Sequence, residues 1–153
     1  MSQRMRFSHR GRLGIAFTVP LCAISMGVCA DGSVPRPAPV AHAIFSAPLS
    51  ELPGRRLVAV RLHFEPGARQ PMPHRHPGSV YVYVTKGVIR LGLEGQPTQV
   101  VHAGESFFEP FGSVHAIAEN PSTTQPATAI AVEVVPEGVP LLTPEQPHTG
   151  GGT

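Results

Sequence analysis

His74-Arg75-His76-Pro77-Gly78 is the stretch from which the fold of this chain can be worked out. Side chains on an extended strand alternate between its two faces, so two histidines separated by one residue point to the same side. Both imidazoles can therefore reach one point in space. A second stretch, Gly104 to His115, adds a third histidine after the turn Pro110-Phe111-Gly112. The three histidines are candidate ligands for a single metal ion.

Short strands separated by turns surround these two stretches. Val80-Tyr81-Val82-Tyr83-Val84 is β-branched and aromatic throughout, which is typical of a strand. Alternation and turn residues predict strands at residues 56–64, 80–84, 88–93, 98–102, 106–109, 114–119 and 127–135, with a first strand near 42–45. No stretch has an amphipathic helical period, and Pro and Gly (18 and 16 residues) recur between the strands. The pattern predicts an all-β sandwich or barrel.

The first 30 residues are predicted to be a secretory signal peptide. Four arginines and no acidic residue precede an apolar stretch from Leu13 to Ala30, and small residues place the expected cleavage after Ala30. An uncleaved membrane anchor is the alternative, because the apolar stretch is almost long enough to span a bilayer. The cleaved form would be secreted or periplasmic.

The rest of the chain is expected to contain one domain. Residues 31–50 are rich in Pro and Ala and suggest an arm or linker that includes the possible first strand. Residues 51–143 would form the barrel, and residues 144–153, which end in three glycines before Thr153, would form a flexible tail.

Removal of residues 1–30 changes the charge of the protein. Of 12 basic residues four are lost, which leaves 8 against 10 acidic residues and a net charge of −2. A nucleic acid partner is therefore not expected, because it would require a basic patch. Both cysteines, Cys22 and Cys29, are lost as well. The mature domain must then be held together by its hydrophobic core and not by disulfides.

These residues resemble the cupins, a family of small β-barrels of the double-stranded β-helix (jelly-roll) type. The first cupin motif runs from a glycine through His-x-His to a glutamate and a later glycine, and it corresponds here to Gly67, His74-Arg75-His76 and Gly87. The second motif corresponds to Gly104, Pro110-Phe111-Gly112, His115 and Asn120, with Asn120 one residue later than usual. The resemblance covers about residues 57–135 and implies an all-β cupin-type barrel.

The resemblance also implies a metal site, with one departure from the usual ligands. The glutamate that follows His-x-His in cupins is normally the fourth ligand, but its position is Val80 here, or Tyr81 if the loop is one residue longer. The implied ligands are therefore His74, His76 and His115 alone. Imidazole suits several divalent metals, so Fe, Zn, Mn, Ni and Cu all stay open.

Glu109 is the candidate catalytic residue, because it precedes Pro110 close to the implied site. Its carboxylate would either orient a ligand histidine or act as a general acid or base, and a solvated carboxylate on the rim is the simpler alternative. Arg75 lies between two ligands and is expected to point away from the metal. His63 and His102 are expected to be ordinary surface or interface residues.

Two functions stay open at this point. The first is a metal-dependent enzyme that acts on a small organic molecule, with oxygenase-type chemistry as the first hypothesis. The second is a non-catalytic barrel that binds a metal or a small ligand, because the usual glutamate is missing. The resemblance further implies a homodimer formed through sheet edges.

Overall fold

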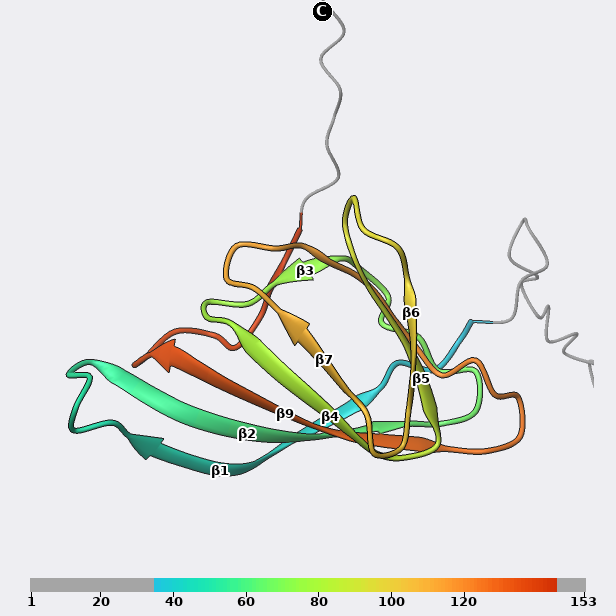
Figure 1. The fold of residues 1–153 in the computed structure, drawn as a ribbon, viewed down its shortest axis with the longest axis horizontal. Coiled ribbons are helices and arrows are strands. Elements are labelled where there is room, and N and C mark those ends of the chain that lie inside the picture. The colour runs from blue at the N-terminus through green and yellow to red at the C-terminus, as the bar shows by residue number, and fades with distance from the viewer. Residues whose placement is uncertain (1–34, 146–153) are drawn as a thin grey trace, which may run out of the picture. The chain divides into compact units, whose positions relative to one another are not determined.

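Two antiparallel sheets make up the part of the chain that the structure describes, residues 35–145 of a computed structural model (Figure 1). Every regular element in this range is a β-strand, and none of these residues belongs to a helix able to cross a membrane. The predicted signal peptide, residues 1–30, lies outside the described residues.

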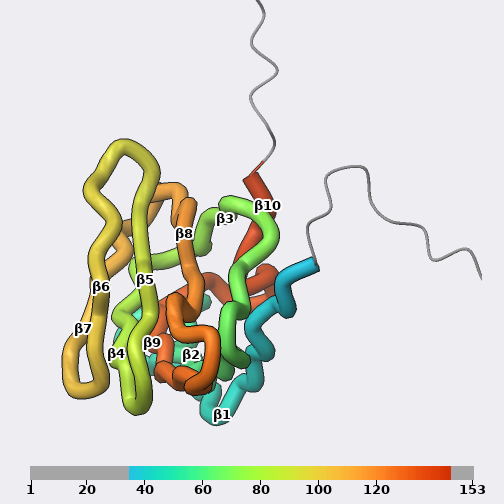
Figure 2. The backbone as a smooth tube through the Cα atoms, turned by 90° about the vertical axis from the view of Figure 1, so that its right-hand side faces the viewer, coloured from blue at the N-terminus to red at the C-terminus, as the bar shows by residue number. Residues whose placement is uncertain are grey.

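Ten strands are defined within the described range. They are β1 (Val40–Pro48), β2 (Arg55–Phe64), β3 (His74–Arg75), β4 (Val80–Lys86), β5 (Val88–Leu93), β6 (Gln99–His102), β7 (Ser106–Glu109), β8 (His115–Glu119), β9 (Ala127–Pro136) and β10 (Thr143–Pro144). The first sheet has the order β1-β2-β9-β4-β7, and the second has the order β10-β3-β8-β5-β6. Figure 2 shows the second sheet, whose strands follow one another from β6 at the left to β10 at the right.

The predicted all-β cupin-type jelly-roll fold is confirmed. The strand expected near residues 42–45 extends over Val40–Pro48 and pairs with β2 along its length, so this part of the predicted arm is the edge of a sheet. The short strands β3 and β10 pair with each other. They bring the first histidines next to the C-terminal end of the described chain.

The core follows from the two-residue period of the strands. On β4, Val80, Val82 and Val84 are buried, whereas Tyr81 and Tyr83 point outward and are exposed. Phe107 is also part of the core, but Phe108 and Phe111 are exposed. On β9, the inward positions carry mostly alanine. Alanine side chains fill little volume, so this wall leaves space between the sheets.

Asn120 joins two loops, the β2–β3 loop and its own β8–β9 loop, at one end of the domain. Its buried side chain donates hydrogen bonds to the backbone carbonyls of Glu65 (3.1 Å) and Gln125 (2.8 Å). The backbone N–H of Ser122 donates to its Oδ1 at 3.0 Å. Because these bonds are partly buried, the amide supplies partners that solvent replaces only in part.

We predict that Asn120→Ala lowers the free energy of unfolding by about 1–3 kcal/mol, because it leaves buried carbonyls without donors. Urea denaturation followed by circular dichroism measures this change. Thr124→Ala, an exposed change in the same loop, serves as the control and is expected to stay within about 0.5 kcal/mol of wild type. Equal urea midpoints for Asn120→Ala and wild type would contradict the bracing role of Asn120.

Candidate metal centre

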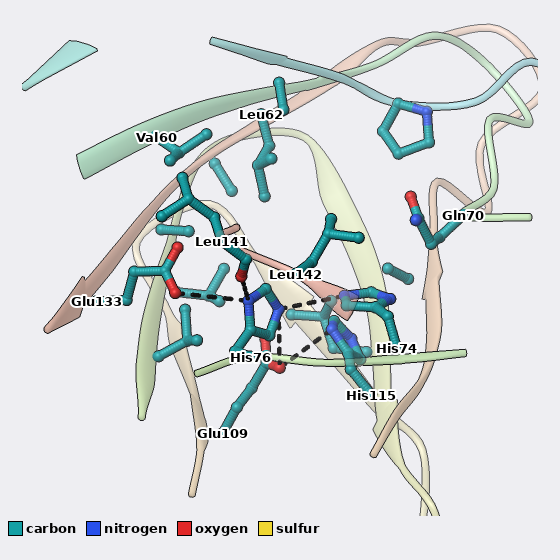
Figure 3. A pocket seen from close by; sticks show the side chains of 18 of the residues that line it. Val60, Leu62, Gln70, His74, His76, Glu109, His115, Glu133, Leu141 and Leu142 are labelled. Carbon is teal, nitrogen blue, oxygen red and sulfur yellow. Dashed lines mark hydrogen bonds and ion pairs between the residues drawn. The ribbon is translucent and has the colours of Figure 1, made fainter. Parts of the chain in front are cut away.

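The three histidines meet at one end of the space between the sheets (Figure 3). His74 on β3 and His115 on β8 are direct cross-strand partners, and His76 follows β3. One ring nitrogen from each of the three lies within 4.8 Å of the others. His74 and His115 are buried, and His76 is partly buried. The predicted ligands His74, His76 and His115 are thus brought together, and we call them the histidine cluster.

Each histidine of the cluster has an acceptor next to Nδ1. His76 Nδ1–H donates to the carbonyl of Leu141 at 2.7 Å, and His74 Nδ1 lies 3.4 Å from the carbonyl of Met72. His115 Nδ1 lies 3.2 Å from Oε2 of Glu109. An acceptor at Nδ1 favours the tautomer that leaves the lone pair on Nε2. All three Nε2 atoms are therefore suited to ligate a metal.

The separation of the Nε2 atoms of His74 and His76 fits a metal ion. His74 Nε2 and His76 Nε2 are 3.2 Å apart, whereas two nitrogens bound to one ion at ~2.1 Å are separated by about 3.0–3.4 Å. Two lone pairs that face each other at this distance need a cation or a proton between them. His115 Nε2 is buried and has no hydrogen-bond partner among the described residues. A metal ion would satisfy all three atoms.

Burial and neighbouring charges separate the protonation of His74 from that of His76. Burial, together with the nearby rings of His115 and His76, lowers the pKa of His74 to about 4. Burial also acts to lower the pKa of His76, but the carboxylates of Glu133 and Glu109 outweigh it and raise this pKa above 6.5. His74 is thus neutral at pH 7, whereas the raised pKa of His76 makes metal binding at this ring more dependent on pH.

Carboxylates flank the position where the family glutamate is missing. Val80 is paired with Glu109 on β7 and with Glu133 on β9, so the three side chains form a row on the inner face of the first sheet. Both glutamates are only 3% exposed. Glu109 Oε2 lies 3.7 Å from His76 Nε2, and Glu133 Oε2 lies 3.6 Å from His76 Nδ1. The negative charge absent at Val80 is supplied from the two neighbouring strands.

Glu133 is the residue of the site that the sequence analysis missed. Its signal was present, because the two-residue period of β9 places Glu133 on the same face as Ala129, Ala131 and Val135. A single carboxylate on an otherwise apolar buried face requires a partner or a function. The predicted residue Glu109, in contrast, does lie beside the histidine cluster, as Figure 3 shows.

A cavity of about 140 Å³ extends from the histidine cluster between the sheets. Its walls are mostly aliphatic and include Val60, Leu62, Val82, Ile89, Leu91 and Ala131. The polar groups His74, His76, His115, Glu109 and Glu133 gather at one end, and Gln70 stands apart from them (Figure 3). This arrangement of an apolar body with a few convergent polar groups is typical of small-molecule sites.

The C-terminal segment, residues 137–145, forms one wall of this cavity. Leu141 and Leu142 line it, and the Leu141 carbonyl accepts the proton of His76. Arg75, which points away from the histidine cluster as expected, forms an ion pair with Glu145 at 2.7 Å. Its guanidinium also donates to the carbonyl of Gly112, in the turn before His115. Arg75 therefore joins the first motif, the second motif and the C-terminal segment.

The other histidines with described surroundings lie outside the cavity. His63 on β2 contacts Glu65 at 3.2 Å, and the side chain of His102 on β6 is exposed. Neither lines the cavity.

Comparison with known proteins supports the family and the fold of the chain. The family model described as "Cupin domain" matches residues 60–133. No curated protein matches the chain. A cupin domain from Bordetella pertussis Tohama I is similar in structure, with a TM-score of 0.53 and 24% identity over 67% of this chain and 98% of that chain. A protein with a double-stranded β-helix domain from Klebsiella pneumoniae has a TM-score of 0.56 and 21% identity over 72% and 86% of the two chains.

We predict that His74 of the metal-free protein titrates near pH 4 and that His76 titrates above 6.5. Long-range ¹H–¹⁵N NMR spectra can follow both rings, with the urea-unfolded chain as reference. As the pH falls, His74 is protonated in the unfolded chain before it is protonated in the folded protein. The His74 contribution to stability therefore falls as the pH drops from 6.5 to about 4. The His76 contribution is full below 6.5 and is lost as the pH rises through its raised pKa. A midpoint for His74 at or above 6.5 would contradict the assigned burial.

We predict that Arg75→Ala weakens metal binding about tenfold, although Arg75 does not contact the metal site, because it releases the segment that supplies the acceptor of His76. Competition with a chelator measures the affinity. Hydrogen exchange should also accelerate at the amide of Glu145, which donates to the Pro73 carbonyl. Arg61→Ala, at an exposed arginine of β2, is the control. If both variants bind metal equally well, Arg75 has no positioning role.

Proposed function

Because this chain belongs to the cupin superfamily, we propose that it is a metal-dependent enzyme that acts on a small organic molecule, with oxygenase-type chemistry. The observation that supports this proposal is that the three histidines share the same arrangement. Each has an acceptor next to Nδ1 and an Nε2 available at the end of an apolar cavity.

The donor set and the local charge suit a divalent ion. Imidazole ligands accept iron, zinc, manganese, nickel or copper, and the residues do not distinguish among these ions. Buried Glu109 and Glu133 place two negative charges beside three ligands that are neutral when they bind a metal, which balances the charge of the ion. A divalent metal held by His74, His76 and His115 would supply Lewis acidity and open positions for a substrate oxygen or O₂.

The cavity defines the class of substrate. Its volume of about 140 Å³ is roughly ten times the minimum needed for one water molecule, so it accepts a small molecule and excludes a polymer. Its aliphatic walls favour a compact apolar body. The polar groups at one end favour a substrate that carries its oxygen atoms on one side, such as a small enol, diketone or phenol.

Glu109 is the residue to which we assign proton transfer. Its carboxylate is buried at the same end of the cavity as the histidine cluster, within 3.2 Å of His115 and 3.7 Å of His76. A buried carboxylate in this place can take a proton from a bound substrate and return it to the product. Glu133, on the far side of the His76 ring, is assigned the role of orienting that ligand.

A non-catalytic binding protein is the second candidate. Two observations favour it: both carboxylates lie within ion-pair distance of histidines, and the C-terminal segment forms one wall of the cavity. A tightly bound ion without an exchangeable position would serve storage or stability. This candidate predicts metal binding without turnover.

We also propose that the protein is exported and forms a homodimer. Export rests on residues 1–30 of the sequence. Among the described strands β1 pairs with β2 alone, so its other edge presents unpaired backbone groups. Val40, Ile44 and Phe45 on this strand are about half exposed, at 48%, 49% and 54%. An edge strand with these properties suits pairing with a second copy.

The test begins with the metal content of protein purified without chelators, for which we expect one ion per chain. Oxygen consumption is then measured with a panel of small enols, diketones, thiols and phenols. Glu109→Gln is expected to keep the metal and to lower turnover about 10²–10⁴-fold, which is the usual contribution of a general acid or base.

The matched variants separate the two candidates. The double variant His74→Ala, His115→Ala should lose both metal and turnover, whereas His102→Ala, at an exposed histidine of β6, should keep both. Full turnover in the double variant would eliminate the enzyme proposal. Stoichiometric metal without turnover on any member of the panel would favour the binding protein.

A further inference from the structure

Three arginines surround one buried carboxylate on the opposite side of the second sheet from the metal cavity. Glu119 on β8 is 8% exposed, and it is the cross-strand partner of Arg90 on β5, whose Nη1 lies 2.7 Å from its Oε1. Arg69 pairs with Glu119 from the other side through an isolated bridge. Arg36 and Arg69 reach Glu119 Oε2 at 3.5 and 3.8 Å. We call Arg36, Arg69 and Arg90 the arginine cluster.

The position of this cluster is distinct from the metal centre. The neighbouring pair Leu91 and Ala118 faces inward and lines the metal cavity. Because side chains alternate along each strand, Arg90 and Glu119 face the other way. One sheet therefore lies between the two sites.

The arginine cluster has an excess of positive charge. Three guanidinium groups face one carboxylate, so two positive charges stay unbalanced. The guanidinium nitrogens of Arg36 and Arg69 approach Glu119 at 3.5 and 3.8 Å, beyond normal hydrogen-bond distance, and neither side chain has another partner among the described residues. Their side chains are 62% and 50% exposed. The guanidinium groups of Arg36 and Arg69 can therefore donate hydrogen bonds to an added anion.

A pocket whose lining loops are connected by hydrogen bonds adjoins the arginine cluster. It measures about 400 Å³ and is lined by Arg36, Arg90 and Glu119 together with loop residues Pro35, Pro37, Pro66, Gly67, Asn120, Pro121 and Thr123. Asn120 fixes these loops through its side-chain bonds, and Gly67 N–H donates to the Ser122 carbonyl at 2.8 Å. Arg69 N–H donates to the Pro37 carbonyl at 2.9 Å, which holds the N-terminal segment in place. The segments that carry and surround the arginines are thus connected by hydrogen bonds.

We propose that the arginine cluster is a binding site for a small doubly charged oxyanion, either a phosphate or a dicarboxylate. The planar guanidinium group matches both oxyanions with paired hydrogen bonds. The excess of two positive charges matches the charge of the anion. Without a bound anion, Glu119 is the shared partner of the three arginines. Its negative charge lowers their affinity for the anion.

The experiment titrates the full-length protein with inorganic phosphate and, separately, with succinate at low ionic strength. Binding is followed by NMR of the arginine Nε–H signals, with chloride at matched ionic strength as the control salt. We expect saturable shifts with phosphate, succinate or both, and the probe that binds identifies the chemical class. His74→Ala is titrated in parallel and should bind the probe as wild type does, which excludes binding at the metal centre.

Charge variants test the assignment to these residues. Arg90→Gln and the exposed change Arg36→Gln should each weaken binding about fivefold to tenfold, whereas Arg55→Gln on β2 should leave it unchanged. Glu119→Gln should strengthen binding about tenfold, because the excess charge rises from two to three. If the arginines and Glu119 formed only a structural salt-bridge network, Glu119→Gln would not strengthen anion binding. The proposal is overturned by the absence of saturable shifts with either probe, by weaker binding in Glu119→Gln, or by an equal loss in Arg55→Gln.

Discussion

The direct pairing of His74 with His115 across β3 and β8 is the constraint on which the rest of the site depends. A shift of one residue in this register would turn one of the two rings to the outer face, because the side-chain period of a strand is two. Yet β3 contains only two residues, so its own ladder is too short to secure the register. The register is reinforced from outside, through the pairing with β10 and through the contacts of Arg75 with Glu145 and Gly112. Arg75, which lies between His74 and His76 in the sequence, thus helps to hold the pairing of His74 with His115 in place.

The row Glu109, Val80, Glu133 explains how carboxylates lie beside the histidine cluster although the usual glutamate is missing. Cross-strand neighbours on one face have Cβ atoms about 4.5–5.5 Å apart, so a carboxylate at position 80 would lie between two others. Three buried negative charges at that spacing would repel one another strongly. Valine in the middle lets each glutamate approach His76 from its own side. The change at position 80 and the presence of two flanking glutamates therefore belong together.

Much of the fold and part of the site were predictable, because their signals lie in short stretches of the sequence. Alternation in β2, β4 and β9 and the two histidine motifs depend on residues close together in sequence, so strands and ligands could be read directly. The role of Glu133 depends on β9 pairing with β4, which no local pattern specifies. The acceptor of His76 is a backbone carbonyl 65 residues away, and backbone carbonyls leave no mark in a sequence. The Arg75–Glu145 pair spans 70 residues and was missed for the same reason.

One proton connects the C-terminal segment to the histidine cluster. His76 Nδ1 carries a single hydrogen, and two acceptors compete for it: the Leu141 carbonyl at 2.7 Å and Glu133 Oε2 at 3.6 Å. The shorter contact goes to Leu141, so the buried Glu133 oxygen has no hydrogen-bond partner among the described residues. A buried carboxylate oxygen without a hydrogen bond is unfavourable, and Glu133 Oε2 would accept the hydrogen bond of His76 Nδ1–H if Leu141 moved away. A carboxylate acceptor makes an imidazole a stronger ligand than a carbonyl does. The same hydrogen bond thus connects the position of the segment that lines the cavity with the basicity of the candidate ligand His76.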